Sequence, residues 1–198
     1  MKSLYIPDVE RNPKPGVYQN VIASTKEQHP EYPKIWDLFA FRPDVTNHLG
    51  RFTQGVLRSP ASIDVAMREL IAAFTSYKNA CGFCTKAHAA AAGELLGDHE
   101  LVWSVLRDLE RSPLAEKDKQ LLRFVEKMTT NLPAIGAADV GVLHDAGWDD
   151  EAIYHAITTC ALFNFYNRWI TATGVPEMSP EAHRRQGEHL AANGYARD

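Results

Sequence analysis

The sequence predicts an all-α protein, a helical domain of about eight helices. Apolar residues recur at spacings of three and four over most of the 198 residues, which places them on one face of a helix. No segment alternates apolar and polar residues over the length of a strand. Prolines and glycines separate the apolar repeats, so the chain divides into helices of ordinary length.

Two regions differ in this pattern. Residues 1–28 contain several prolines and little apolar periodicity, and they are predicted to form an N-terminal extended arm with at most one short helix. Residues 29–198 carry the helical repeats and are predicted to form a single domain. A chain of this length buries enough surface to form a core without disulfides.

The first four predicted helices end where a proline or a polar or small residue interrupts the repeat. Each carries apolar residues three or four positions apart. They cover about residues 35–42, ended by Pro43; 45–57, ended by Pro60; 62–78, capped by Ser62 and ended at Asn79; and 81–96, ended by Gly97.

The remaining predicted helices follow the same rules, and the last of them is more polar than the others. They cover about residues 101–109; 114–128, ended before Pro133; 137–145, closed by Gly147; 149–173, capped by Asp149 or Asp150 and ended by Gly174; and 180–193.

A weak internal likeness links two parts of the chain. A shift of 82 residues places Glu69 on Glu151 and Cys81 on Phe163. A degenerate internal repeat, whose second copy lost its chemistry, would explain the likeness. Two short windows can also match by chance, so the sequence leaves both interpretations open.

Composition excludes several classes of function. The net charge is −4, and the 21 basic residues are scattered rather than clustered, so no nucleic-acid partner is expected. No apolar stretch has the length of a membrane span or a signal peptide. Three cysteines are too few for a secreted disulfide framework. We therefore expect a cytoplasmic protein that does not associate with membranes.

The most informative stretch is Cys81-Gly-Phe-Cys84, followed by His88. If a helix starts near Cys81, the two sulfurs lie one turn apart and within disulfide reach, and His88 lies one turn further, beside Cys84. A helix N-terminus and a neighbouring histidine both lower the pKa of a thiol. Because His88 can accept and return a proton, we expect Cys84 to be the attacking thiolate, with a pKa below about 8.5, and Cys81 to be the resolving thiol.

Glu69 enters the candidate site through the predicted tertiary structure. It lies about ten residues before the turn at Asn79, and His88 lies about nine residues after it. In an antiparallel pair of helices the two side chains return to a similar height. Glu69 can then orient His88 or relay its proton, directly or through one water.

Other interpretations of these cysteines remain open. Both could be small core residues, since free cysteine is often buried. Cys81, Cys84 and His88 could also be three ligands of a zinc ion, although a structural zinc site needs a fourth. Cys160 lies in an apolar stretch and is expected to be a packed core thiol.

The motif resembles that of a known family. Glu69, Cys81-x-x-Cys84 and His88, at this spacing, resemble the alkyl hydroperoxidase D-like branch of the carboxymuconolactone decarboxylase superfamily. The later stretch at residues 145–168 resembles the peroxidase-related members of that branch. Together the likeness covers roughly residues 35–176.

The resemblance implies an all-helical fold, a homo-oligomer and reduction of hydroperoxides by thiols, with no cofactor or metal. It makes Cys84 the peroxidatic cysteine, Cys81 the resolving one, and His88 with Glu69 the proton relay. The reductant would be an external dithiol, either lipoyl or thioredoxin-like. Phe83 departs from the pattern, because some relatives place a polar residue there, and it removes any relay through that position.

Two other functions remain as alternatives. One is a cofactor-free lactone decarboxylase or related lyase on the same fold, with His88 and Glu69 as acid and base; the decarboxylase branch typically lacks the cysteine pair. The other is a redox-sensing or zinc-stabilised interaction protein without turnover. A lyase would keep most of its activity after Cys84→Ser, whereas a thiol peroxidase would not.

Overall fold

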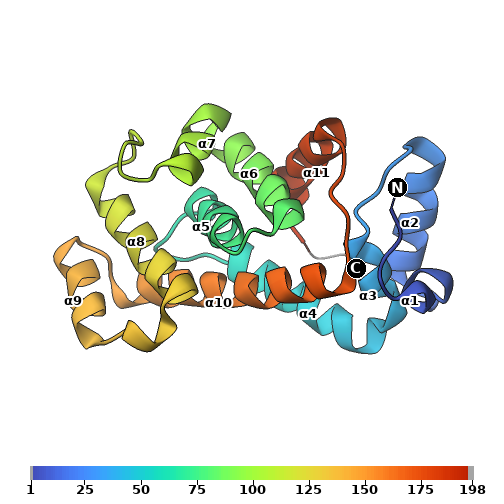
Figure 1. The fold of residues 1–198 in the computed structure, drawn as a ribbon, viewed down its shortest axis with the longest axis horizontal. Helices are drawn as coiled ribbons and strands as arrows, with labels where there is room; N and C mark the ends of the chain where they lie inside the picture. Colours follow the sequence, from blue (N-terminus) through green and yellow to red (C-terminus); the bar gives the residue numbers. More distant parts are fainter. Residues whose placement is uncertain (1, 196–198) are drawn as a thin grey trace.

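The computed structural model describes residues 2–195, and within that range it contains α-helices, one short 3-10 helix and no strand (Figure 1). The all-α class is confirmed. The helices are α1 Pro7–Arg11, α2 Val17–Gln28, α3 Ile35–Phe41, α4 Pro43–Arg58, α5 Val65–Lys78, α6 Gly82–Leu96, α7 His99–Arg107, α8 Glu116–Thr130, α9 Ala137–Asp145, α10 Asp150–Thr173 and α11 Pro180–Asn193, with the 3-10 helix at Leu132–Ala134.

The extended arm predicted for residues 1–28 is wrong. This region forms α1 and α2, two helices beyond the ranges that the sequence predicted, and they raise the number of helices in the described residues above the expected eight. Tyr18 and Ile22 lie one turn apart on α2 and are buried in the same core cluster as Trp36 and Phe39. Val17 and Val21 pack against the same cluster, so α2 has an apolar face, and α3 covers that face.

The expected N-cap of α5 is also corrected. Asp64, not Ser62, caps the helix, and its carboxylate accepts the backbone N–H of Met67 at 2.6 Å. The Ser62 hydroxyl instead donates to Asp149, the N-cap residue of α10, at 2.6 Å. The N-cap residue of α10 is thereby hydrogen-bonded to the segment that precedes α5.

Helix α10 spans the long direction of the molecule, and α5 packs across it (Figure 1). Helices α5 and α6 form a hairpin, and α11 packs on the other side of α6 (Figure 1). Helices α8 and α9 cover the first half of α10, whereas α4 packs on its second half, near α1–α3. Among residues 2–195, no helix combines the length and the apolar composition that crossing a bilayer requires.

The degenerate internal repeat is not found in this fold. Glu69 and Cys81 belong to the hairpin of α5 and α6, which reverses the chain between them. Their counterparts Glu151 and Phe163 lie on a single uninterrupted helix, α10. The two windows therefore have different structures, and the structure favours a chance likeness.

The interior contains two large apolar clusters, and the cysteines are divided between them. Cys160 is fully buried with residues of α5, α7 and α8. Cys81 and Cys84 lie in the second cluster, with residues of α2, α3, α4 and the later half of α10. The candidate site is thus in the half of the molecule that contains the N-terminal helices.

Candidate active site

The chain reverses sharply just before the cysteine pair. Ala80 has a φ of 54°, a left-handed conformation that non-glycine residues adopt rarely. The backbone N–H of Cys81 donates to Ser76 O at 3.0 Å, and Cys81 becomes the N-cap residue of α6. Cys84 follows in the first turn of that helix. The expected start of the helix at the cysteine motif is confirmed.

Both sulfurs are enclosed, since Cys81 is 4% exposed and Cys84 is 2% exposed. Glu177, in the segment between α10 and α11, lies directly over Gly82 and forms an ion pair with Lys86. A side chain at position 82 would collide with the Glu177 carboxylate, so glycine permits this close cover. The first turn of α6 is therefore shielded from solvent on its outer side.

The two thiols differ in acidity, and the order is the reverse of the expected one. The pKa of Cys81 is lowered to about 6, first by a hydrogen bond from the Cys84 thiol and further by the Cys84 backbone N–H and by side chains of Thr171 and Asn167, against the opposing effect of burial. The pKa of Cys84 is raised well above its usual value by the same thiol–thiol bond, by burial and by the charge on Cys81. The expectation that Cys84 carries the lowered pKa is wrong for the resting dithiol, because the Cys84 thiol donates to the Cys81 sulfur and is itself buried beside the Cys81 charge.

This order predicts a titration that distinguishes the cysteines. In the reduced protein, ultraviolet thiolate absorbance should show one thiolate forming near pH 6 and no second one until well above pH 9. Cys81→Ser should abolish the low-pH step, whereas Cys160→Ser should leave it unchanged, because burial raises the pKa of Cys160. A low-pH step that survives in Cys81→Ser and disappears in Cys84→Ser would restore the order expected from the sequence.

Glu69 and His88 meet across the α5–α6 hairpin, as expected. Nδ1 of His88 lies 2.8 Å from Oε2 of Glu69, which is fully buried. An ionised carboxylate only accepts hydrogen bonds, so the proton of this contact sits on Nδ1. Nε2 is consequently the nitrogen at which His88 can take up and release a proton.

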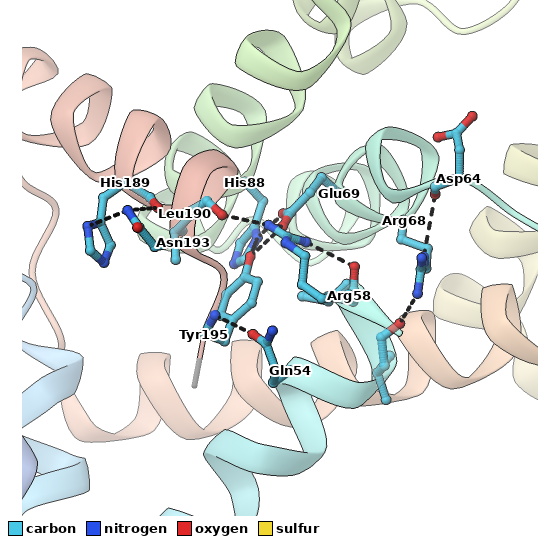
Figure 2. A network of polar contacts seen from close by, with 12 residues as sticks. Gln54, Arg58, Asp64, Arg68, Glu69, His88, His189, Leu190, Asn193 and Tyr195 are labelled. Atoms are coloured by element: carbon cyan, nitrogen blue, oxygen red, sulfur yellow. Dashed lines mark hydrogen bonds and ion pairs between the residues drawn. The ribbon is translucent and has the colours of Figure 1, made fainter. Parts of the chain in front are cut away.

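Two residues that the sequence did not indicate complete this cluster (Figure 2). Nη2 of Arg58, at the end of α4, donates to Oε1 of Glu69 at 2.6 Å. The hydroxyl of Tyr195 donates to the same oxygen at 2.6 Å and lies 3.1 Å from Nδ1 of His88. Each carboxylate oxygen of Glu69 therefore has at least one donor, and the Arg58 guanidinium balances its charge.

These partners decide the ionisation of Glu69. Burial on its own raises the pKa of a carboxyl group. Here the hydrogen bond and charge of His88, the charge of Arg58 and the hydrogen bond from Tyr195 outweigh burial and hold the pKa of Glu69 below its usual value. Glu69 is thus a permanent buried anion at neutral pH that fixes the orientation of His88.

A small cavity of about 80 Å³ opens beside Cys84 and His88. Its wall is mostly aromatic and aliphatic, and Cys84, but not Cys81, is among the residues that line it. Tyr195 and Leu190 close it from the C-terminal side. The remaining lining includes Tyr18, Trp36, Phe39, Thr53, Phe83, Phe163, Tyr166 and Ile170. An apolar molecule in this cavity would lie next to the Cys84 sulfur.

The other residues that the sequence singled out are packed against neighbouring side chains. Cys160 is 0% exposed and contacts Thr129 and Asn164 in the other cluster, as expected for a packed core thiol. Phe83 lines the cavity and packs against His183. Within residues 2–195, no three His, Cys, Asp or Glu side chains are grouped so that they could hold a metal ion.

Two solved structures with the same arrangement of helices are peroxidase-related proteins. An uncharacterized peroxidase-related protein from Silicibacter sp. TM1040 is 27% identical, with a TM-score of 0.76 over 87% of this chain and 90% of that one. An alkylhydroperoxidase AhpD core, an uncharacterized peroxidase-related protein from Ralstonia eutropha JMP134, is 20% identical, with a TM-score of 0.75 over 89% and 97%. This is an alkylhydroperoxidase D-like fold.

Other comparisons define how far the likeness extends. The apo form of the debrominase Bmp8 is 17% identical, with a TM-score of 0.69 over 86% of this chain and 91% of that one, and shares the alkylhydroperoxidase D-like fold. No protein-family model and no curated protein sequence matches the chain. The fold agrees with the superfamily resemblance of the Glu69–Cys81–Cys84–His88 motif.

The sequence carries too little signal to identify Arg58 and Tyr195. Arg58 is the last residue of α4, where a basic residue is ordinary. Tyr195 lies 126 positions after Glu69, beyond a polar helix with no chemical motif. Only the packing of α11 on α6 in this alkylhydroperoxidase D-like fold brings the end of the described chain to the relay.

Proposed function

We propose that the protein is a thiol peroxidase that reduces organic hydroperoxides through a disulfide between Cys84 and Cys81. The observation that carries the proposal is the position of Cys84, which lines an apolar cavity together with His88. His88 is in turn held by the buried Glu69 anion. A nucleophile, a base and an apolar binding space thus occur together.

In the first step, Nε2 of His88 takes the Cys84 proton when a hydroperoxide occupies the cavity. The Cys84 thiolate attacks the outer peroxide oxygen, so that an S–O bond forms and the O–O bond breaks. The alcohol leaves with the proton that His88 returns, and Cys84 becomes a sulfenic acid. Sulfur is oxidised by two electrons and the peroxide is reduced by the same number.

The unequal acidity of the two thiols suits the second step. Cys81 is already a thiolate at neutral pH, since its pKa is lowered to about 6. It attacks the Cys84 sulfur and forms the disulfide, and the hydroxyl group leaves as water after taking up a proton. An external dithiol then restores both thiols by exchange. A low pKa on the resolving cysteine shortens the life of the sulfenic acid.

The lining of the cavity supports an organic substrate over hydrogen peroxide. It is mostly aromatic and aliphatic and can bury an apolar body beside Cys84.

Assembly into a homo-oligomer also stays a proposal. Tyr154 and Phe165 are 64% and 46% exposed on α10, and a second copy of the chain could cover them.

The decisive assay is turnover of cumene hydroperoxide with a small dithiol, followed by peptide mapping. We expect saturable turnover and, after one equivalent of hydroperoxide without reductant, a single crosslink between Cys81 and Cys84. Cys160 should remain a free thiol because it is fully buried away from the pair. A crosslink to Cys160, or a Cys81–Cys84 disulfide that forms without any consumption of peroxide, would contradict the proposal.

A further inference from the structure

We propose that Tyr195 is a positioning residue of the Glu69–His88 relay, so that the chain beyond α11 tunes the protonation of His88. This inference rests on the proposed function only for its effect on catalysis. The contacts themselves tie Tyr195 to the relay whatever the substrate is. Figure 2 shows its hydroxyl directed toward the Glu69–His88 pair.

Three contacts hold Tyr195 in place. Its backbone N–H donates to Oε1 of Gln54, on α4, at 2.6 Å. Its ring stacks on the His88 imidazole, with centroids 6.0 Å apart and planes inclined by 13°. The Arg58 guanidinium lies over the same ring, 5.0 Å from its centroid. The hydroxyl is therefore aimed at Glu69 from a fixed ring.

Gly194 makes this approach feasible. Its φ is 69°, and a Cβ at this position would lie 2.5 Å from Oε1 of Gln54, the same atom that anchors Tyr195. Any other residue would strain the backbone and push Gln54 away. The turn after α11 is thus built so that residue 195 comes back against the relay.

The hydroxyl competes with His88 for the charge of Glu69. The Tyr195 hydroxyl donates to Oε1 of Glu69, while Nδ1 of His88 donates to Oε2. Burial and the nearby Glu69 charge raise the pKa of Tyr195, so its hydroxyl stays protonated and remains a donor. When a carboxylate loses one hydrogen-bond donor, more of its negative charge is left to stabilise a neighbouring imidazolium. The Tyr195 hydroxyl and the His88 imidazole therefore share the carboxylate of Glu69.

The groups that face His88 come from five segments. Cys84 lies on α6 itself, and the carboxylate of Glu69 reaches it from α5. Arg58 approaches from α4 through Glu69, and Tyr195 approaches from beyond α11. Helix α10 contributes the ring of Phe163, 4.4 Å from the imidazole centroid, and the Tyr166 hydroxyl, which is paired with Thr53. Among these groups Tyr195 supplies the neutral hydroxyl that bonds the Glu69 carboxylate, and its removal changes no formal charge and leaves both thiols in place.

The test is an NMR titration of the His88 imidazole in the reduced wild type and in Tyr195→Phe. We expect the titration midpoint to move upward by about one pH unit in the variant, because one hydrogen bond to a charged group is lost. If the protein is a peroxidase, the acid limb of kcat/KM should move by the same amount. Activity on that limb then falls about tenfold and recovers at higher pH.

Two further variants make the result specific. Tyr32→Phe removes another buried hydroxyl that bonds a carboxylate, that of Asp37 at 3.0 Å, outside the cavity, and should leave the His88 midpoint unchanged. Gly194→Ala should displace Tyr195 without altering its hydroxyl and should move the midpoint in the same direction as Tyr195→Phe.

The outcomes separate this inference from the proposed function. An unchanged midpoint in folded Tyr195→Phe, or an equal shift in Tyr32→Phe, would overturn the role of Tyr195. A shifted midpoint in a protein that reduces no hydroperoxide would keep that role and remove the peroxidase proposal.

Discussion

Cys84→Ser is expected to abolish hydroperoxide turnover, with activity falling to the background of the assay. Cys84 lines the cavity beside His88, and within residues 2–195 no other thiol does so. A serine hydroxyl at this position holds its proton far more tightly than a thiol and has no sulfur to be oxidised to a sulfenic acid. Steady-state rates with cumene hydroperoxide and a small dithiol measure the loss.

Cys81→Ser is expected to give a different defect. The first attack by Cys84 should proceed, and mass analysis should find one equivalent of sulfenic acid, followed by over-oxidation when peroxide is in excess. Turnover should stop after this single event because the resolving thiolate is missing. Cys160→Ser is the matched control and should keep its activity, since that thiol lies in the other apolar cluster.

The reverse pattern would reassign the two cysteines. If Cys81→Ser turns over normally while Cys84→Ser reacts once with peroxide, Cys81 is the peroxidatic residue, and its lowered pKa serves the attack rather than the resolution. If both variants keep full activity, thiol chemistry is wrong. The lyase alternative then gains support only if a lactone substrate responds to a change at His88.

His88→Ala and Glu69→Gln should each slow turnover by roughly 10²–10⁴-fold, the usual range for loss of general acid–base catalysis. His88→Ala removes the base, and Glu69→Gln removes the anion that fixes Nδ1–H while keeping the shape of the side chain. The double variant should cost less than the product of the two single losses, because the residues act as one relay.

The free energy of unfolding of these variants must be measured together with their turnover rates. Glu69→Gln leaves the guanidinium of Arg58 with no carboxylate partner, and breaking a buried ion pair in this way typically costs about 3–5 kcal/mol of unfolding free energy. Thermal unfolding will therefore separate lost activity from lost fold. His144→Ala, at an exposed histidine paired with Asp150, is the control and should change neither quantity. Full activity in folded His88→Ala would refute the relay.

The sequence predicted those parts of the structure that depend on local spacing. The helices from α3 to α11 follow from apolar periodicity and from prolines and glycines at their ends. Cys84 and His88 are four residues apart, so a helix alone brings them together. Glu69 was found because the α5–α6 turn at Asn79 places it opposite His88 at the same height.

The rest depends on tertiary packing. Helix α2 packs its apolar face against α3, and Tyr195 reaches Glu69 because α11 docks on α6. The predicted order of acidity of the two thiols was wrong for a related reason. The sequence indicates that both are near a helix start, but only the packed structure shows Cys84 enclosed and donating to Cys81.

The continuity of α10 has a mechanical consequence for the whole molecule. Its first half supplies Ile153 and Ala156 to one apolar cluster, and its second half supplies Phe163 and Ile170 to the other. A helix of 24 residues is about 36 Å long, so one continuous element is packed into both clusters. We therefore expect the two clusters to unfold as one cooperative unit, and we expect a molecule bound next to Cys84 to stabilise the distant end that contains Cys160 as well.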